Sequence, residues 1–375
     1  MTLSESTFET IRKSEFSALS SIYFNAAYMG PMPARTRLSV IDSTERWGDP
    51  SYMDYGWVGI PDRVREKIAS LLGCSAERIA LNSSTSEVIS FAAFGLGLQA
   101  GDHVALVEGE YPSDVLSWML AAERSGAVVD FFPAAKLADP RGWVQEFHPK
   151  TKVCNVSHVS FQTGSMVDLK ALGAALADRD ILFVADVTQS FGGMPLDPQA
   201  LAYIDVMPCS TYKWMLAPYG QAFSYWSEKA CQRIQHMHAG WLTMPQAPQN
   251  LTAYTKAVRP GARKFDRGQT PNVLGALGLE TSLGLLAEVG LSRIYEHNQT
   301  LVRHFHENYS RQKYQLLTVG EGSNILCLKA QNIDSGDLQA RMRQAGIDVS
   351  VREGNLRISF HLFNGIREVE ALLKV

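Results

Sequence analysis

The chain has 375 residues, of which 46% are hydrophobic and 19% charged, and its formal net charge is −3. This composition is typical of a globular protein of two or three domains and offers no basic field for nucleic acid or an anionic membrane. The five cysteines form no CxxC pair, which argues against a zinc site and favours a reducing compartment. We find no signal sequence and no run of roughly 18 apolar residues, so we expect a cytoplasmic protein without a membrane span.

Helices and short apolar strands alternate through the first two thirds of the chain. Residues 1–20 are predicted to be helical, whereas glycine and proline interrupt residues 24–33. Pro61 and Gly73 mark the start and the end of a helix. Strands are predicted at 78–82, 103–108, 127–133, 152–160, 181–186 and 204–210. Further helices are predicted to begin at Thr85, Pro112 and Asp168. Because the strands are continuously apolar, we expect a mostly parallel sheet with helices on both faces.

The last third of the chain has a different pattern, typical of a small α+β unit. The polar segment 255–270, which contains proline and glycine, is the expected boundary. One long helical stretch is predicted over 271–312. It is followed by strands at 324–330 and 355–360 and by helices at 335–346 and 365–375.

Ligands of open α/β sheets bind at the carboxyl ends of the strands, so the residues after each strand are the candidates. Hydroxyl residues at 83–86 open a helix, where free N–H groups can bind an anion, although a simple N-cap gives the same pattern. Asp186 ends an apolar strand and Gln189 follows it. Such a carboxylate can hold a proton on a heteroaromatic nitrogen and the amide can meet a phenolate oxygen, although aspartate is also common in turns.

Lys213 follows the next strand, between apolar and aromatic segments. Its ammonium group either reaches water along an aliphatic stem or is held among apolar groups with a lowered pKa, ready to attack a carbonyl. A phosphate site, a carboxylate and an amine at one edge of a sheet are together what pyridoxal phosphate requires. The combination favours the buried amine.

The motifs "ADVTQS", "STYKW", "RGQTPN" and "LRISFHLFN" extend this pattern over nearly the whole chain. With them the chain resembles the class V aminotransferase-type pyridoxal-phosphate enzymes, which include cysteine desulfurases, kynureninases and isopenicillin-epimerase-like proteins. The resemblance implies the α/β fold of aspartate aminotransferase, with a mostly parallel seven-stranded sheet between helices and a smaller α+β C-terminal domain. Residues 21–258 would form the large cofactor-binding domain, and residues 1–20 with 259–375 the small one. It also implies a homodimer with active sites at the subunit interface.

The same resemblance assigns roles to individual residues. Lys213 would bind the cofactor aldehyde covalently, Asp186 would pair with the pyridine nitrogen, Gln189 would face the ring oxygen and Tyr111 would stack on the ring. The phosphate would be held by Thr85, Ser86, Ser210 and Tyr212, and by Thr270 of the partner subunit. His158 either joins the site or only satisfies buried backbone groups.

Arg357 lies in an alternating stretch in which Leu356, Ile358 and Phe360 share the opposite face. Its guanidinium can therefore enter the cleft between the domains and bind a substrate carboxylate, as the family pattern implies, rather than lie in water. Asn25 is a further candidate for substrate binding. We expect an amino acid as the small-molecule substrate. We expect no metal ion, since the histidines of "HMH" and "HFH" do not share a helix face.

The reaction is the open question. Transfer of the amino group, epimerisation and elimination all begin with loss of the α-proton. A cysteine desulfurase would need a cysteine shortly before the arginine, where this chain has Ser350, and Cys327 lies too far upstream. We expect an aminotransferase first and an epimerase or lyase second. A non-enzymatic pyridoxal-phosphate-fold protein and a nicotinamide dehydrogenase are less favoured, the latter because its glycine fingerprint is missing.

Overall fold

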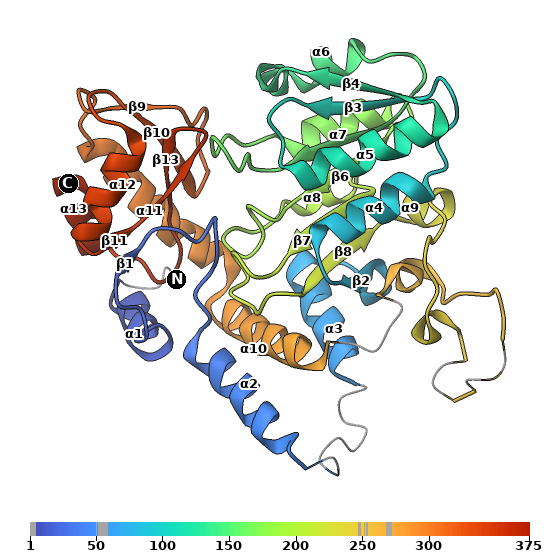
Figure 1. Ribbon diagram of the computed structural model, residues 1–375, viewed down its shortest axis with the longest axis horizontal. Coiled ribbons are helices and arrows are strands. Elements are labelled where there is room, and N and C mark those ends of the chain that lie inside the picture. The colour runs from blue at the N-terminus through green and yellow to red at the C-terminus, as the bar shows by residue number, and fades with distance from the viewer. Residues whose placement is uncertain are drawn as a thin grey trace.

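The computed structural model describes residues 5–49, 51, 59–246, 249–250, 252, 254–267 and 272–375 (Figure 1). The large sheet has seven strands in the order β2-β8-β7-β6-β5-β3-β4. Its strands are β2 (Ile79–Asn82), β3 (His103–Val107), β4 (Val128–Phe132), β5 (Thr151–Ser157), β6 (Leu182–Asp186), β7 (Val206–Ser210) and β8 (Ala222–Trp226). All neighbours are parallel except β8, which runs antiparallel to both β2 and β7. The predicted mostly parallel sheet is confirmed.

Helices cover both faces of this sheet, as the continuously apolar strands predict (Figure 1). One apolar cluster joins the sheet to α4 (Thr85–Gly95), α5 (Pro112–Ser125) and α9 (Glu228–Arg233). The cluster on the other face includes residues of α3 (Ile60–Leu72), α6 (Pro140–Gln145), α7 (Leu169–Ala177), α8 (Pro198–Leu201) and α10 (Val273–Val289). The large sheet therefore lies between two apolar layers.

Local signals in the sequence set several helix ends. Helix α3 has Pro61 in its first turn and ends at Gly73, whose φ of 69° suits a residue without Cβ. Ser84 caps α4 by accepting a hydrogen bond from the Glu87 N–H, and Asp168 caps α7 in the same way. These caps fix where the chain leaves each strand and enters the next helix.

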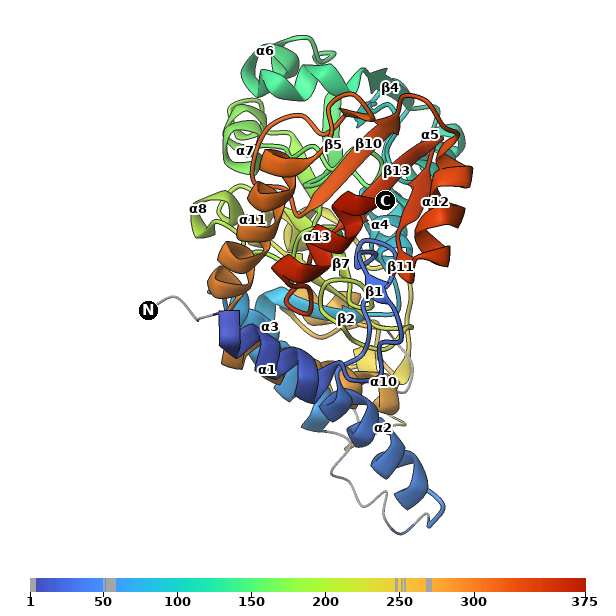
Figure 2. The same ribbon diagram turned by 90° about the vertical axis from the view of Figure 1, so that its left-hand side faces the viewer.

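The C-terminal part forms a second, smaller layer beside the large sheet (Figure 1), and this layer faces the viewer in Figure 2. Its antiparallel sheet has the order β12-β13-β10-β9, and a parallel pair joins β1 to β11. The strands are β1 (Ile22–Tyr23), β9 (Tyr314–Leu316), β10 (Ile325–Ala330), β11 (Ile347–Asp348), β12 (Ser350–Arg352) and β13 (Asn355–Ser359). The helices that pack here are α11 (Leu291–Asn308), α12 (Ser335–Gln344) and α13 (Ile366–Lys374).

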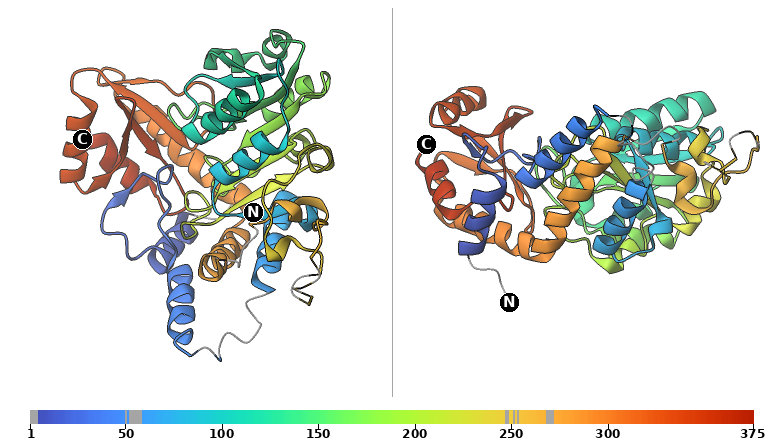
Figure 3. Two further views of the ribbon diagram at one scale, coloured as in Figure 1. Left: turned by 45° about the vertical axis from the view of Figure 1, so that its right-hand side comes forward. Right: turned by 90° about the horizontal axis from the view of Figure 1, so that it is seen from below.

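The single helix predicted over 271–312 is wrong, because Gly290, at a φ of 89°, divides it into α10 and α11. Helix α10 packs against α2 (Ala34–Arg46) and α3 below the large sheet, and α11 packs against α13 (Figure 3). Among the described residues no single helix could cross a membrane. Helices α10 and α11 would pass as a pair by length and composition, and they meet at a bend of 73°.

The N-terminal part, with α1 (Glu5–Glu15) and β1, lies against the small layer, and its next segment reaches the large one (Figures 1 and 2). Gly30 donates its N–H to the Tyr212 carbonyl, and a Cβ at Gly30 would lie 2.0 Å from the Lys213 carbonyl oxygen. Only glycine allows this approach. The 3₁₀ turn at Gly261–Phe265 packs against β2 of the large sheet. The division of the chain into two domains at residue 258 stays a prediction.

Candidate active site

A pocket of about 150 Å³ opens at the carboxyl ends of the parallel strands, where ligands of such sheets bind. It gathers residues that lie far apart in the sequence because β5, β6 and β7 are neighbours and end at the same edge. Its lining consists of Ser84, Thr85, Ser86, Tyr111, Ser113, Ser157, Phe161, Asp186, Thr188, Gln189, Ser210, Tyr212 and Lys213. The sequence-predicted residues Thr85, Ser86, Tyr111, Asp186, Gln189, Ser210, Tyr212 and Lys213 thus share one pocket.

Lys213 lies in the turn after β7 and is buried, with only 8% of its surface exposed. Among the described residues its Nζ makes no hydrogen bond, and it lies 5.6 Å from the Tyr111 ring centroid and 5.7 Å from that of Tyr212. Burial lowers its pKa to about 8, opposed by the negative charge of Asp186 and assisted by the positive charge of Arg357. The amine is therefore poised to lose its proton near neutral pH.

Asp186 ends β6 and is the negative group behind this lysine. One carboxylate oxygen accepts the Thr188 N–H at 2.7 Å. Burial raises the pKa of the Asp186 carboxyl, while the hydrogen bonds from Thr188 and the charge of Lys213 act in the opposite direction. A carboxylate in this position can hold a proton on a nitrogen in the pocket.

Two further carboxyl groups lie beside Asp186, and the sequence did not point to either. Asp114, in the first turn of α5, is completely buried and accepts a hydrogen bond from Asn155 Nδ2 at 2.9 Å. Burial, together with the charges of Asp186 and Glu110, raises the Asp114 pKa well above its ordinary value. Asp114 therefore holds a proton more readily than an ordinary aspartic acid. Glu110 accepts from the N–H of Ser157 at 2.7 Å and from its Oγ, and burial raises its pKa as well.

The hydroxyl groups form a connected network at the N-terminus of α4. Thr85 Oγ1 is 2.9 Å from Ser210 Oγ and 2.9 Å from Thr188 Oγ1, and Thr188 Oγ1 accepts the Ser210 N–H. Ser86 Oγ lies 2.6 Å from Ser113 Oγ. Hydroxyl groups, the free N–H groups of a helix start and its dipole together favour an anion such as phosphate. Thr188, which sequence reasoning missed, lies in the quoted motif "ADVTQS".

Aromatic and amide side chains complete the walls. Tyr111 lines the pocket, is 46% exposed and meets Phe161 edge to face. The rings of Tyr212 and Tyr219 stack with their centroids 4.2 Å apart, and burial raises the pKa of the Tyr212 phenol to about 12. Gln189 donates to the Ala27 carbonyl and accepts from the Trp214 indole, so only one of its amide hydrogens remains for a ligand.

Arg357 and Asn25 lie outside the pocket lining, at the side of the small layer. Arg357 is 2% exposed and donates to Ser350 Oγ at 3.2 Å and, from Nη1, to the carbonyl of the pocket residue Phe161 at 2.7 Å. Its Nη2 is buried and has no hydrogen-bond partner in the described part of the chain, and the same holds for Asn25 Oδ1. Burial lowers the pKa of Arg357 to about 9.

His158 has a hydrogen bond of 2.9 Å between its Nδ1 and Ser190 Oγ, and burial lowers its pKa to about 4, so it is neutral at pH 7. Its backbone N–H donates to the Asp186 carbonyl and its own carbonyl accepts from Val167. His158 is not among the residues that line the pocket. Thr270 lies outside the described residues.

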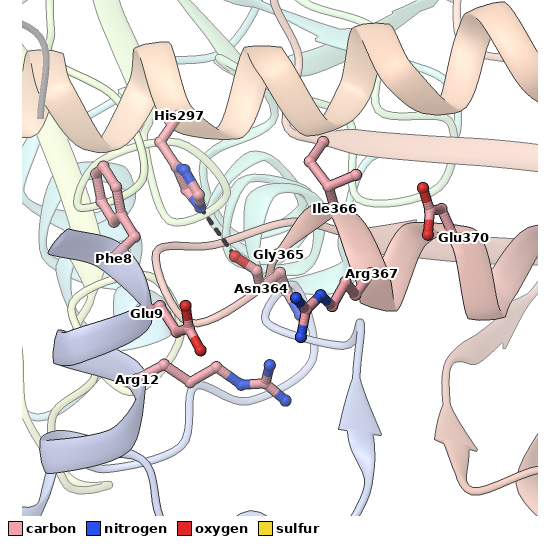
Figure 4. A pocket seen from close by; sticks show the side chains of 9 residues that line it. All are labelled: Phe8, Glu9, Arg12, His297, Asn364, Gly365, Ile366, Arg367 and Glu370. Carbon is pink, nitrogen blue, oxygen red and sulfur yellow. Dashed lines mark hydrogen bonds between the residues drawn. The ribbon is translucent and has the colours of Figure 1, made fainter. Parts of the chain in front are cut away.

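A second pocket, of about 500 Å³, lies between α1, α11 and α13 (Figure 4). Its histidine, His297, stacks on Phe8 and bonds to the Asn364 carbonyl through Nε2. Arg12 pairs with Glu368. It is larger than the first pocket but contains none of the sequence-predicted residues.

The fold and the first pocket together define a pyridoxal-phosphate-dependent enzyme. The aldehyde of this cofactor needs a buried amine for covalent attachment, its ring nitrogen needs a carboxylate, and its phosphate needs hydrogen-bond donors. The pocket contains all three kinds of group. The family model for class V aminotransferases matches residues 60–372, and the chain belongs to that family.

Named relatives agree with this assignment. The chain is 27% identical over 331 residues to a probable cysteine desulfurase of Methanothermobacter thermautotrophicus, covering 82% of this chain and 80% of that protein. It is 30% identical over 297 residues to the kynureninase of Deinococcus radiodurans, covering 76% and 70%. The apo cysteine desulfurase from Thermococcus onnurineus has the same fold, with a TM-score of 0.84 at 22% identity over 98% of this chain and 96% of that one.

The residues present fit pyridoxal phosphate. The phosphate would be held by Thr85, Ser86 and Ser210 at the start of α4, where the hydroxyl network already has its oxygens grouped. Asp186 provides the only carboxylate among the described residues that line the pocket. Lys213 Nζ, buried and without a hydrogen-bond partner among the described residues, suits a covalent bond to the aldehyde.

Proposed function

We propose that the protein acts at the α-carbon of an amino acid whose carboxylate binds Arg357. The observation that carries this proposal is Lys213: a buried amine with a pKa of about 8 in front of Asp186. A base with a pKa near the working pH is best suited to remove a proton and return it. The bound cofactor supplies a ring that withdraws electrons from the α-carbon.

The described side chains divide the remaining tasks. Arg357 holds the substrate carboxylate through its free Nη2, which fixes the α-carbon near Lys213. Lys213 takes the α-proton and delivers it again. Asp186 keeps a proton on the ring nitrogen, and the buried Asp114, whose pKa is raised well above its ordinary value, lies beside it.

For the fate of the substrate we place cleavage of a bond to the β-carbon first and transfer of the amino group second. The relatives named kynureninase and cysteine desulfurase favour cleavage. No cysteine is among the described residues that line the pocket, and the buried Cys327 has a thiol pKa raised to about 11, so the proposal excludes a thiol that receives sulfur. A Bacillus subtilis relative is named as an uncharacterized aminotransferase, so transfer of the amino group is retained as the second candidate reaction.

The test is to incubate the purified holoenzyme with single amino acids, with and without a keto acid, and to identify the products. Cleavage gives a shortened product without any keto acid, whereas transfer gives a new amino acid only when one is present. Lys213→Ala should abolish both reactions. Full turnover by Lys213→Ala would overturn the proposal, and epimerised substrate alone would replace it by the epimerase alternative.

We also propose a homodimer in the cytoplasm. Apolar side chains are exposed on α2 and on α5, including Leu38 at 63%, Ile41 at 50%, Leu116 at 60% and Met119 at 45%. Exposed apolar surface of this kind favours association. Five free cysteines suit a reducing compartment. Light scattering of the purified protein tests the dimer, and a monomer at micromolar concentration would contradict it.

A further inference from the structure

A second guanidinium, that of Arg352, lies beside Arg357 on the hairpin β12–β13. The register of this hairpin places Ser350 opposite Arg357 and Arg352 opposite Asn355. Because side chains alternate between the two faces of a strand, Ser350, Arg352 and Arg357 all point to one face. The hydrogen bond between Arg357 Nε and Ser350 Oγ agrees with this arrangement. The positive charge of Arg352 also contributes, after burial, to the low pKa of Arg357.

Neither guanidinium forms a salt bridge with an acidic side chain in the described part of the chain. Asp348, on the preceding strand, accepts a hydrogen bond from Asn25 Nδ2 at 3.1 Å. Arg357 Nη2 is buried, and none of the described residues offers it a hydrogen-bond partner. Two like charges on one face of a hairpin repel each other, and an anion between them would relieve that repulsion.

The Arg352 guanidinium contacts neighbouring protein groups and still has N–H donors available for a ligand. Its Cζ lies 5.5 Å from the centroid of the half-exposed Tyr28 ring, and its Nη1 donates to the Val351 carbonyl at 2.9 Å. These two contacts hold the guanidinium near Tyr28 and the backbone of β12. Its Nε and Nη2 have no hydrogen bond among the described residues, so they can receive a carboxylate edge.

We propose that Arg352 is a second anion subsite next to Arg357, and that the substrate is an amino acid whose side chain ends in an acidic group. The inference rests on the proposed function, in which Arg357 binds the α-carboxylate. Arg357 already donates from Nε and Nη1 to protein oxygens, so its free Nη2 serves one carboxylate. Arg352 then binds the acidic group at the end of the substrate side chain.

The experiment compares each acid with its own amide. L-aspartate, L-asparagine, L-glutamate and L-glutamine are titrated into the holoenzyme while the absorbance of the bound cofactor is followed, and a Kd is obtained for each. In at least one acid–amide pair the wild type should favour the acid by about tenfold or more. Arg352→Gln should bring that ratio close to one with little change in the Kd of the amide, and Arg352→Lys should restore part of the preference.

Arg343→Gln, an exposed arginine on the neighbouring helix α12, is the matched control and should leave the ratio as in the wild type. An unchanged ratio in Arg352→Gln, or an equal loss for acid and amide, would overturn the inference, the latter because both arginines would then share one carboxylate. Binding of the amides without any preference for the acids defeats this inference but leaves the proposed function standing. A holoenzyme whose spectrum responds to no amino acid defeats both.

Discussion

Replacement of Lys213 by methionine should stabilise the cofactor-free protein at neutral pH. The ordinary lysine pKa of 10.5 falls to about 8 in the folded protein because the ammonium is buried. At roughly 1.4 kcal/mol for each pH unit, this difference corresponds to about 3 kcal/mol that the folded state loses when it takes up the charge. Methionine has a similar unbranched chain and no charge, so the variant avoids this cost.

The difference in unfolding free energy between Lys213→Met and the wild type should depend on pH. Below pH 8 the lysine is charged in both states and the full cost is present. Between pH 8 and 10.5 the unfolded chain binds the proton and the folded protein does not, so wild-type stability rises relative to Lys213→Met. The advantage of the variant should therefore fall from about 3 kcal/mol at pH 7 towards zero near pH 10.5.

Urea unfolding of the cofactor-free proteins at several pH values measures this difference. Lys313→Met, which replaces an exposed lysine, is the control and should differ little from the wild type at any pH. An advantage of Lys213→Met that does not change with pH, or a variant less stable than the wild type at pH 7, would refute the buried-amine argument.

Three other predictions concern the surroundings of this lysine. Thr85→Val removes the hydroxyl that joins Ser210 and Thr188, and it should weaken pyridoxal phosphate binding about tenfold, measured by fluorescence titration of the cofactor-free protein; unchanged affinity would contradict the phosphate role. Asp114→Asn replaces a buried acid whose pKa is raised, so the stability of the wild type relative to the variant should decline as the pH rises from 4 to 7; an equal stability difference at both pH values would show that the Asp114 pKa is not raised. Gly30→Ala should cost about 1–3 kcal/mol in urea unfolding, because its Cβ would meet a backbone oxygen at 2.0 Å, whereas Gly284→Ala, in open space on α10, should be neutral or stabilising; equal effects would contradict the close approach.

The sequence by itself determined the class of fold and the order of the chemical groups. Continuously apolar strands indicated a sheet covered on both faces. Asp186, which ends one strand, and Lys213, which follows the neighbouring strand, were placed at the edge of the sheet where ligands bind. The alternation around Arg357 put that residue on the face opposite the core of the small layer. These predictions depend on short-range patterns, which a sequence shows directly.

Other features were decided only by the tertiary structure. Asp114 has the sequence signature of an ordinary acid in the first turn of a helix, and only the packing of α5 on the sheet buries it beside Asp186. The helical stretch over 271–312 has one continuous pattern, yet its two halves pack on different layers and break at Gly290. Arg352 has no distinctive motif either, since it reaches Arg357 only through the register of a hairpin. Burial and pairing between distant segments set these charges and contacts, and neither is written in the local pattern of residues.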